Sequence, residues 1–301
     1  MKAALTAALI LGAAPALAQD VTIPTARGEA ALPAAPESVV VYDLAALDTL
    51  DALGVGVDGV PDMIGVDYLD ETAAEAQVVG TLFEPDFEAV NALSPDLAIV
   101  GGRSATQYDA LSGMVPTIDM TIPGESLVET GLSRIDAYGT LFRREAEAAD
   151  LRQRLEDRIA TAQDAVEGRG DGLIVLTNGP KVSAYGAGTR FGWLHTTLGL
   201  PEAADTDSAG RHGQPVSFEF IANADPDWLI VIDRAAAIGA EGARAEATLD
   251  NPLVAGTTAW EAEQVIYLDP ADTYLAGGGA QSMARTLDTM ISAFGGAGSD
   301  S

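Results

Sequence analysis

The chain contains no cysteine, which excludes disulfide bonds, thiolate metal sites and a lipid anchor attached through a cysteine. Basic residues are also scarce. The sequence has 16 Lys and Arg against 45 Asp and Glu, which gives a formal net charge of −29. Nucleic acids and anionic membranes both bind basic surfaces, so we expect neither as a partner.

Lysine is almost missing among the few basic residues. Lys2 and Lys181 are the only lysines, so the other basic residues are arginines. Arginine keeps its charge and presents a rigid fork of donors that fits planar, oxygen-rich anions. Four arginines follow predicted strands or precede predicted helices: Arg103, Arg190, Arg211 and Arg234. Any one of them alone is expected to be a surface residue, but as a set they are candidates for binding an anion.

Catalytic patterns are absent as well. The sequence has no G-x-S-x-G and no H-E-x-x-H motif, and no spacing pairs a serine or an aspartate with either histidine. His195 lies among apolar residues of a predicted helix, which indicates a structural histidine. His212 lies beside a glycine in a predicted loop, where a ligand role stays open. The glycine run 277–279 lacks the lysine of a phosphate-binding loop, so we interpret it as the start of a helix. We expect no enzymatic activity.

No apolar run is long enough to span a membrane. Residues 1–18 combine Lys2, a short apolar run and an Ala-x-Ala pattern ending at Ala18, which is typical of a cleavable secretory signal. We therefore expect a soluble protein without a membrane span or lipid anchor, exported to a periplasm.

Two segments 131 residues apart share one pattern: a helix, a Pro-Asp pair, an apolar strand and an arginine. The matching pairs are Phe87/Phe218, Glu88/Glu219, Pro95/Pro226, Asp96/Asp227, Ile99/Ile230, Val100/Val231 and Arg103/Arg234. Chance is the alternative, because Pro-Asp before an apolar strand is common in α/β proteins. We interpret the repeat as two similar lobes with a cleft between them.

The order of the predicted elements indicates an α/β fold. Strands at 39–42, 97–100 and 116–120, and again at 173–177, 228–233 and 265–268, alternate with helices, so each lobe should contain a mostly parallel sheet. Residues 131–167 lack proline and repeat apolar residues at helical spacing, which predicts one connecting helix of about 50 Å. The predicted organisation is a signal at 1–18, a lobe at 19–130, the helix at 131–167 and a lobe at 168–301.

Several segments together resemble the periplasmic iron–siderophore binding proteins of ABC importers, in the helical-backbone class (class III, cluster A), and among them those for catecholate siderophores. The segments are 39–54, 79–90, 95–103, 189–192, 212–219, 226–234, 266–270 and 274–278. The resemblance covers nearly the whole chain after the signal. It implies two α/β lobes bridged by one long α-helix, which agrees with the fold read from the residues.

The resemblance implies a transported ferric siderophore of the catecholate type, with a tetradentate ligand as one option, and no intrinsic cofactor. In relatives that take tetradentate catecholates, a loop histidine and a tyrosine complete the coordination of the iron, and His212 and Tyr274 match them. Fe(III) is a hard ion that suits a phenolate oxygen, and imidazole also binds iron. Arg103, Arg190 and Arg234 match the arginines that hold the anionic ligand. Asp272 and Thr273 stand where relatives often carry aromatics, which leaves the particular siderophore open.

The resemblance also implies a monomer that docks on an ABC permease dimer through one acidic residue on each lobe. Glu88 and Glu219 match these positions, with Glu84 as a neighbour able to share the role of Glu88. The alternative for both is a favourable charge at a helix N-terminus, worth about 0.3–1 kcal/mol. Other functions kept open are a binder of haem, cobalamin or a hydroxamate siderophore in the same fold, and an exported hydrolase.

Overall fold

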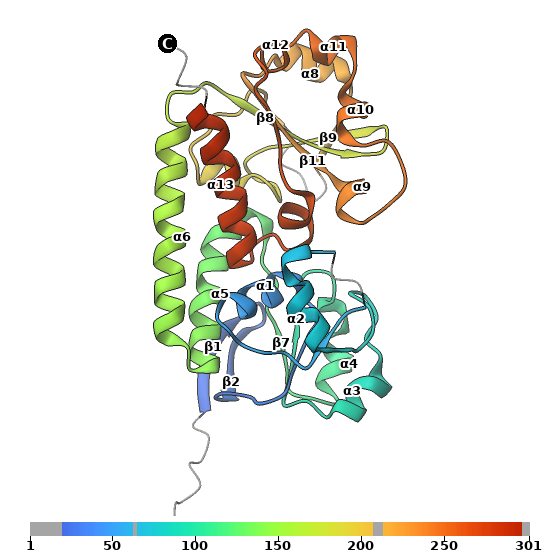
Figure 1. The fold of residues 1–301 in the computed structure, drawn as a ribbon, viewed down its shortest axis with the longest axis vertical. Helices are drawn as coiled ribbons and strands as arrows, with labels where there is room; N and C mark the ends of the chain where they lie inside the picture. The colour runs from blue at the N-terminus through green and yellow to red at the C-terminus, as the bar shows by residue number, and fades with distance from the viewer. Residues whose placement is uncertain (1–19, 63–64, 207–212, 297–301) are drawn as a thin grey trace, which may run out of the picture.

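The computed structural model describes residues 20–62, 65–206 and 213–296. The predicted signal segment 1–18 and His212 lie outside the described residues. Figure 1 shows two α/β lobes stacked along the long axis, with long helices running along one side of both. The predicted two-lobe α/β fold is therefore confirmed.

The N-terminal lobe contains a five-stranded sheet in the order β5-β4-β3-β6-β7, and all its ladders are parallel. Three of its strands are the predicted ones, and two very short strands extend the sheet at one edge. The bounds are β3 Val39–Val41, β4 Gly59–Val60, β5 Gln77–Val78, β6 Leu97–Val100 and β7 Thr117–Asp119. The central strands are fully buried, as their continuous apolar sequences predict.

The C-terminal lobe contains a second five-stranded sheet, in the order β10-β9-β8-β11-β12. Strand β9 is antiparallel to both of its neighbours, and the other four strands run in one direction. The bounds are β8 Gly172–Asn178, β9 Lys181–Tyr185, β10 Gln214–Val216, β11 Trp228–Asp233 and β12 Val265–Tyr267. The sheet is thus mostly parallel, with one reversed strand that belongs to the hairpin β8–β9.

The repeated segment forms equivalent helices in the two lobes. Helix α3 (Phe87–Leu93) and helix α8 (Phe218–Ala224) keep the 131-residue offset, and each ends at a residue in the left-handed conformation, Ser94 or Asp225. The Pro-Asp carboxylates also correspond. Asp96 accepts the backbone N–H groups of residues 37 and 38, and Asp227 accepts that of residue 171, each just before the neighbouring strand begins. The repeat in the sequence therefore corresponds to a repeat in the structure.

A helical hairpin connects the two lobes and precedes the C-terminal lobe in the chain. Helix α5 spans Leu127–Phe142 and helix α6 spans Glu145–Val166. Arg143 lies between them with φ 54°, and α6 packs back on α5 where an added Cβ on Gly139 would lie 2.5 Å from Ala148 Cβ. The prediction of one helix over 131–167 was wrong in extent. The long bridging helix is α6, about 33 Å long at 1.5 Å per residue.

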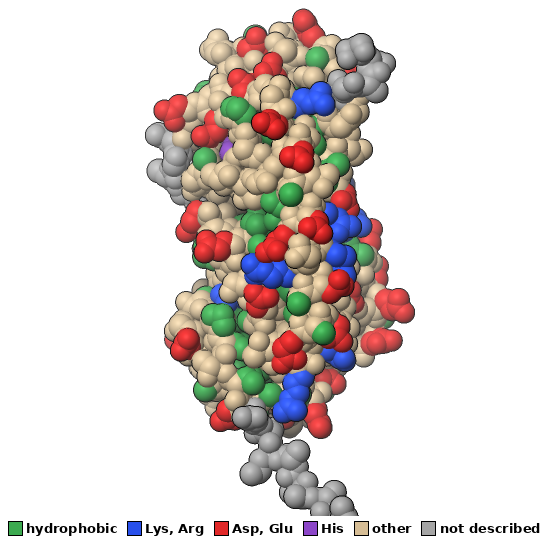
Figure 2. Space-filling view, turned by 90° about the vertical axis from the view of Figure 1, so that its left-hand side faces the viewer, with side chains coloured by type: hydrophobic (Ala, Val, Ile, Leu, Met, Phe, Trp, Pro, Cys, Tyr) green, Lys and Arg blue, Asp and Glu red, His purple; other side chains and the backbone are tan. Residues whose placement is uncertain are grey.

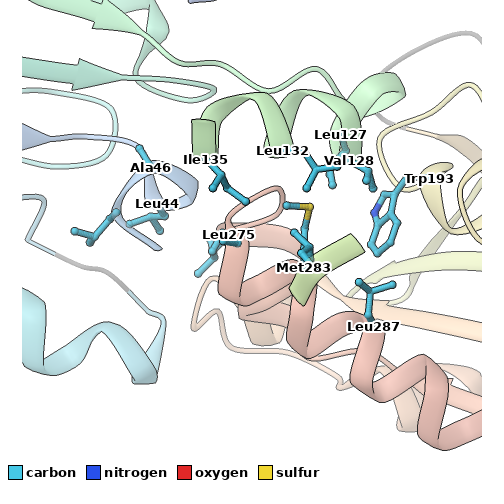
Figure 3. Packing of buried hydrophobic residues seen from close by; sticks show 14 of the residues in the cluster. Leu44, Ala46, Leu127, Val128, Leu132, Ile135, Trp193, Leu275, Met283 and Leu287 are labelled. Atoms are coloured by element: carbon cyan, nitrogen blue, oxygen red, sulfur yellow. The ribbon is translucent and has the colours of Figure 1, made fainter. Parts of the chain in front are cut away.

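A second helix also spans both lobes. Helix α13 (Ala280–Gly296) packs along α6, starts beside α1 (Leu44–Ala52) of the N-terminal lobe, and ends in the C-terminal lobe, where Phe294 packs on Trp228 at 4.0 Å between ring centroids (Figure 1). Figure 3 shows α5 residues such as Leu132 facing Met283 of α13. One continuous apolar core therefore runs between the lobes.

The remaining elements are short and lie around these layers. An N-terminal hairpin, β1 with β2, packs on α5, where Arg134 donates to the Pro24 carbonyl at 2.7 Å. None of the helices in the described ranges is long and apolar enough to cross a membrane. The other bounds are β1 Asp20–Thr25, β2 Gly28–Pro33, η1 Asp67–Leu69, α2 Asp70–Glu75, η2 Ala105–Gln107, α4 Tyr108–Ser112, η3 Gly124–Ser126, α7 Trp193–Thr196, α9 Arg234–Ala237, α10 Ala245–Leu249, α11 Pro252–Ala255, α12 Thr258–Glu261 and η4 Ala271–Leu275.

Candidate ligand site between the lobes

Tyr274 lies on η4, a single π-helical turn between β12 and α13. The turn begins where Asp269 Oδ1 accepts the backbone N–H groups of Ala271 and Asp272, at 2.9 and 3.0 Å. Tyr274 is half-buried, whereas both of its neighbours are buried. The turn therefore fixes the backbone and leaves the phenol ring as the accessible group.

Three arginines from both lobes converge on this tyrosine. Arg103 of the N-terminal lobe donates to the carbonyl oxygens of Tyr274 at 2.7 Å and Leu275 at 3.2 Å. Arg190 donates to the same Tyr274 carbonyl at 2.5 Å, and Arg234 Nε donates to the Tyr274 phenol oxygen at 2.9 Å. The structure thus brings together four of the five predicted ligand-binding residues, at distances that no sequence spacing indicates.

The guanidinium groups also surround the aromatic ring. Their central carbons lie 4.5 Å (Arg190), 5.3 Å (Arg103) and 5.7 Å (Arg234) from the ring centroid of Tyr274. Burial alone would raise the pKa of the Tyr274 phenol, but the Arg234 hydrogen bond and the three positive charges outweigh it and hold this pKa below its ordinary value. Burial and the nearby charge of Arg103 lower the pKa of Arg190. The site is therefore a local excess of positive charge.

Several arginines elsewhere in the molecule form ion pairs. Figure 2 shows acidic and basic side chains intermixed on the face that includes α6, where Arg152 pairs with Asp136 and Glu156, and Arg158 pairs with Asp288. Among the residues that the structure describes, none of the three arginines around Tyr274 has a carboxylate within 4 Å. None of the three is therefore neutralised by a direct ion pair with a described carboxylate.

His212 is outside the described residues, but the structure describes the residue that follows it. A Cβ added to Gly213 would lie 2.7 Å from the ring of Tyr185, so the backbone here lies directly against that ring. Tyr185 is buried next to Phe191, and the charges of Arg190 and Arg234 act on its pKa, which burial raises. Gly213, the residue after His212, therefore lies just before β10 at the edge of the arginine cluster.

Two residues that border the cluster were not predicted from the sequence. Tyr185 ends strand β9, and Asn178 ends strand β8, where its Oδ1 accepts a hydrogen bond from Arg234 at 3.2 Å. Both are the last residue of a strand, whereas the predicted arginines lie one to five residues beyond a strand end. Their position at a strand end is the feature of the sequence from which these two residues could have been predicted.

Two other predictions concern residues that do not belong to the cluster. His195 is buried and its Nδ1 lies 2.9 Å from the Leu200 carbonyl oxygen, which confirms a structural histidine. The glycine run 277–279 leads directly into α13, which confirms that it starts a helix.

Glu88 and Glu219 lie in the first turns of α3 and α8 and are exposed. Hydrogen bonds from its own backbone N–H and from the Ser217 hydroxyl lower the pKa of Glu219. In Figure 1 the two helices lie toward opposite ends of the molecule, one on each lobe. The two carboxylates are therefore equivalent, well separated and accessible.

A large open cavity of about 720 Å³ lies elsewhere, against the C-terminal end of α6. Four acidic residues line it: Asp164, Glu167, Asp171 and Asp227. Such a lining repels anions, so for an anionic ligand the arginine cluster is the better site. Within the described ranges, no group of three or more His, Asp or Glu side chains is arranged to hold a metal ion.

Comparison with known families gives a match over most of the chain. The model of a family described as "Periplasmic binding protein" matches residues 39–271. The petrobactin-binding protein YclQ of Bacillus subtilis is 36% identical over 260 residues, which cover 85% of this chain and 82% of YclQ.

Solved structures share the architecture. The catecholate-siderophore binding protein VctP of Vibrio cholerae superposes with a TM-score of 0.85 at 28% identity, over 91% of this chain and 100% of VctP. The siderophore-binding protein BauB, solved with two molecules of acinetobactin and ferric iron, superposes with a TM-score of 0.83 at 27% identity, over 92% of this chain and 99% of BauB.

Proposed function

Because this chain belongs to the periplasmic binding protein family, we propose that it captures an anionic ferric siderophore between its two lobes and delivers it to an ABC importer. One observation carries the proposal. Three guanidinium groups, contributed by both lobes, surround Tyr274 with no carboxylate within ion-pair distance among the described residues. This arrangement serves binding, and we expect no catalysis.

Electrostatics favour an anionic ligand. In a chain with a net charge of −29, an anion is repelled by the protein as a whole and needs a local positive site. Arginines supply charge-assisted hydrogen bonds to such a ligand, and their fork geometry fits the paired oxygens of a catecholate. A ligand without negative charge would leave Arg103, Arg190 and Arg234 without an ion pair to a described carboxylate. This argues for a catecholate over cobalamin or a neutral hydroxamate complex.

The relatives support iron complexes as the class of ligand. The names of the similar proteins state petrobactin for YclQ, catecholate siderophores for VctP, and a complex of ferric iron with two acinetobactin molecules for BauB. We infer that this protein binds a ferric catecholate, and that the ligand is tetradentate.

A tetradentate ligand leaves two coordination places on iron, which we assign to Tyr274 and His212. The Tyr274 oxygen accepts a hydrogen bond from Arg234, which stabilises negative charge on the phenol and suits it to a hard cation. Gly213, which follows His212 in the chain, lies against Tyr185 just before β10, at the edge of the same cluster. A hexadentate ligand would fill the coordination of iron by itself and would need neither residue.

The test compares ferric bis-catecholate with ferric tris-catecholate. We expect Tyr274→Phe and His212→Ala to weaken binding of the first far more than the second and to shift its visible charge-transfer band, because each variant removes one iron ligand. Tyr267→Phe is the control, since this exposed tyrosine on β12 is outside the cluster. Equal losses for both iron complexes would refute the coordination role, and no binding of either complex by the unmodified protein would refute the proposed function.

We further propose that a monomer of this protein docks on a permease dimer through Glu88 and Glu219. The support is their equivalence: both carboxylates are exposed in the first turn of corresponding helices, one on each lobe. Two equivalent acidic points fit a partner with two equivalent basic points. Glu84, which is also exposed, is available beside Glu88.

A further inference from the structure

Helix α13 begins without a capping residue of its own. The three residues before Ala280 are glycines, which have no side chain to accept the free N–H groups of the first turn. Helix α1 of the opposite lobe supplies these acceptors. Thr49 Oγ1 accepts from Ala280 N at 3.2 Å, and Asp48 accepts from Gln281 N at 2.7 Å and Ser282 N at 2.9 Å. The helix is therefore capped across the two lobes.

Asp48 lies in the contact between α1 and the first turn of α13. Its side chain is fully buried, and its Oδ2 also accepts a hydrogen bond of 2.5 Å from the Tyr68 hydroxyl. A Cβ added to Gly279 would lie 2.5 Å from Asp48 Cγ, so only glycine permits this close approach. Figure 3 shows residues of α1 lying near the loop that carries Leu275, just before α13. The glycine run thus serves the contact with Asp48.

The first turn of α13 is linked in turn to the loop of Tyr274. Ser282 Oγ donates to the Ala276 carbonyl at 2.7 Å, and Gly279 N donates to the same carbonyl at 2.9 Å. Ala276 N bonds back to the Ala271 carbonyl at the start of η4. A short series of hydrogen bonds therefore connects the Asp48 carboxylate to the turn that positions Tyr274.

We propose that Asp48 is a positioning residue for Tyr274, which it holds to the N-terminal lobe through the first turn of α13. The inference rests on the proposed role of Tyr274 in binding the iron complex. Arg190 and Arg234 belong to the C-terminal lobe, whereas Arg103 and Asp48 tie the Tyr274 loop to the N-terminal lobe. Asp48 thereby sets where the phenol stands relative to both halves of the arginine cluster.

Asp48→Asn is the first variant, because the amide keeps the size of the side chain but turns one acceptor into a donor that faces a backbone N–H. We expect the Kd for ferric bis-catecholate to rise about tenfold, or ~1.4 kcal/mol. In a Tyr274→Phe background the same change should raise Kd less than about twofold, because coupled residues are not additive. Binding of ferric tris-catecholate should be unaffected.

Asp96→Asn is the matched control. Asp96 also accepts two backbone N–H groups through its carboxylate, but within one lobe, so this variant should leave both dissociation constants unchanged. If Asp48→Asn does not fold, Tyr68→Phe removes one hydrogen bond to Asp48 and should give a smaller change of the same kind. Equal effects of the Asp48 or Tyr68 variant with and without the Tyr274→Phe change would overturn the inference. Failure of the unmodified protein to bind the iron complex would instead count against the proposed function.

Discussion

Arg103 and Arg234 end the two copies of the repeated segment, yet they contact different parts of the same tyrosine. Arg103 donates to the backbone carbonyls of Tyr274 and Leu275, and Arg234 donates to the Tyr274 phenol oxygen. Strand β11 continues to the residue before Arg234, whereas β6 ends three residues before Arg103. The two arginines therefore lie at different distances from the ends of their strands.

The two copies of the repeated segment have the same scaffold but make different contacts with Tyr274. The helix and its left-handed end are equivalent in the two lobes because they depend on local sequence, and each Pro-Asp carboxylate accepts a backbone N–H just before the neighbouring strand. The arginine contacts differ because both arginines contact the same segment, η4, which cannot present the same face to both lobes. Equivalent sequences thus build a site with two distinct sides, one that holds the loop and one that acts on the phenol.

The strongest test of lobe equivalence concerns the permease. Glu88→Arg combined with Glu219→Arg should abolish iron uptake by whole cells while purified protein still binds the siderophore, because both docking charges are reversed. Glu145→Arg with Glu167→Arg makes the same change in charge at the two exposed ends of α6 and should leave uptake near normal. Normal uptake by the Glu88 and Glu219 variant would rule out the docking role.

The second test distinguishes the two arginines. Arg103→Ala and Arg234→Ala should each weaken ferric catecholate binding by about 1.5–3 kcal/mol, the scale of a hydrogen bond to a charged group. Lysine at either position should restore only part of the affinity, since it lacks the fork of arginine. We expect only Arg234→Ala to shift the visible band as well, because Arg234 contacts the phenol oxygen. Titration and absorption spectra measure both effects.

Arg154→Ala is the control for these variants, since Arg154 pairs with Asp150 on the outer helix α6. It should bind as the unmodified protein does. Identical spectra for the Arg103 and Arg234 variants would show that the two sides of the site are not distinct.

The third test concerns the lobe junction and its dependence on pH. Burial raises the pKa of Asp48 from near 4 to about 7, despite the hydrogen bonds from Tyr68, Gln281 and Ser282; Asp272, paired with Arg285, also faces this group. Between these values the folded state binds more protons than the unfolded state, so this contribution to stability is lost as pH rises. From about pH 5 to about pH 7.5, the free energy of unfolding should therefore fall more steeply in the unmodified protein than in Asp48→Asn. Urea unfolding at the two pH values measures this difference, and parallel slopes would contradict it.

The smallest effects are expected at the paired aspartates of the repeat. Asp96→Ala and Asp227→Ala should each lower the free energy of unfolding by about 0.5–1.5 kcal/mol, since each removes a carboxylate that accepts from the backbone just before a neighbouring strand. Ligand affinity should not change. If one variant lost much of its free energy of unfolding and the other none, the two aspartates would not stabilise their lobes equally.

Much of the fold follows from local sequence. The six predicted strands appear with bounds within two residues, because buried parallel strands are continuous apolar runs that few other elements imitate. The short strands β4 and β5 were missed, since two residues carry no periodic signal. The break between α5 and α6 was also missed, because Arg143 ends α5 in a conformation that sequence associates with glycine.

The two-lobe α/β class and the repeat could be read from the order of the residues, and the resemblance to a known family indicated the arginines and tyrosine of the candidate site. Which atoms meet could not: the Tyr274 carbonyl bonds to Arg103 and Arg190, its phenol to Arg234, and Asp48 to the start of α13. The apolar patterns that predict strands and helices each lie within a short stretch of the chain. These contacts instead join residues from 40 to 234 positions apart, and their geometry exists only once both lobes have packed on α6 and α13.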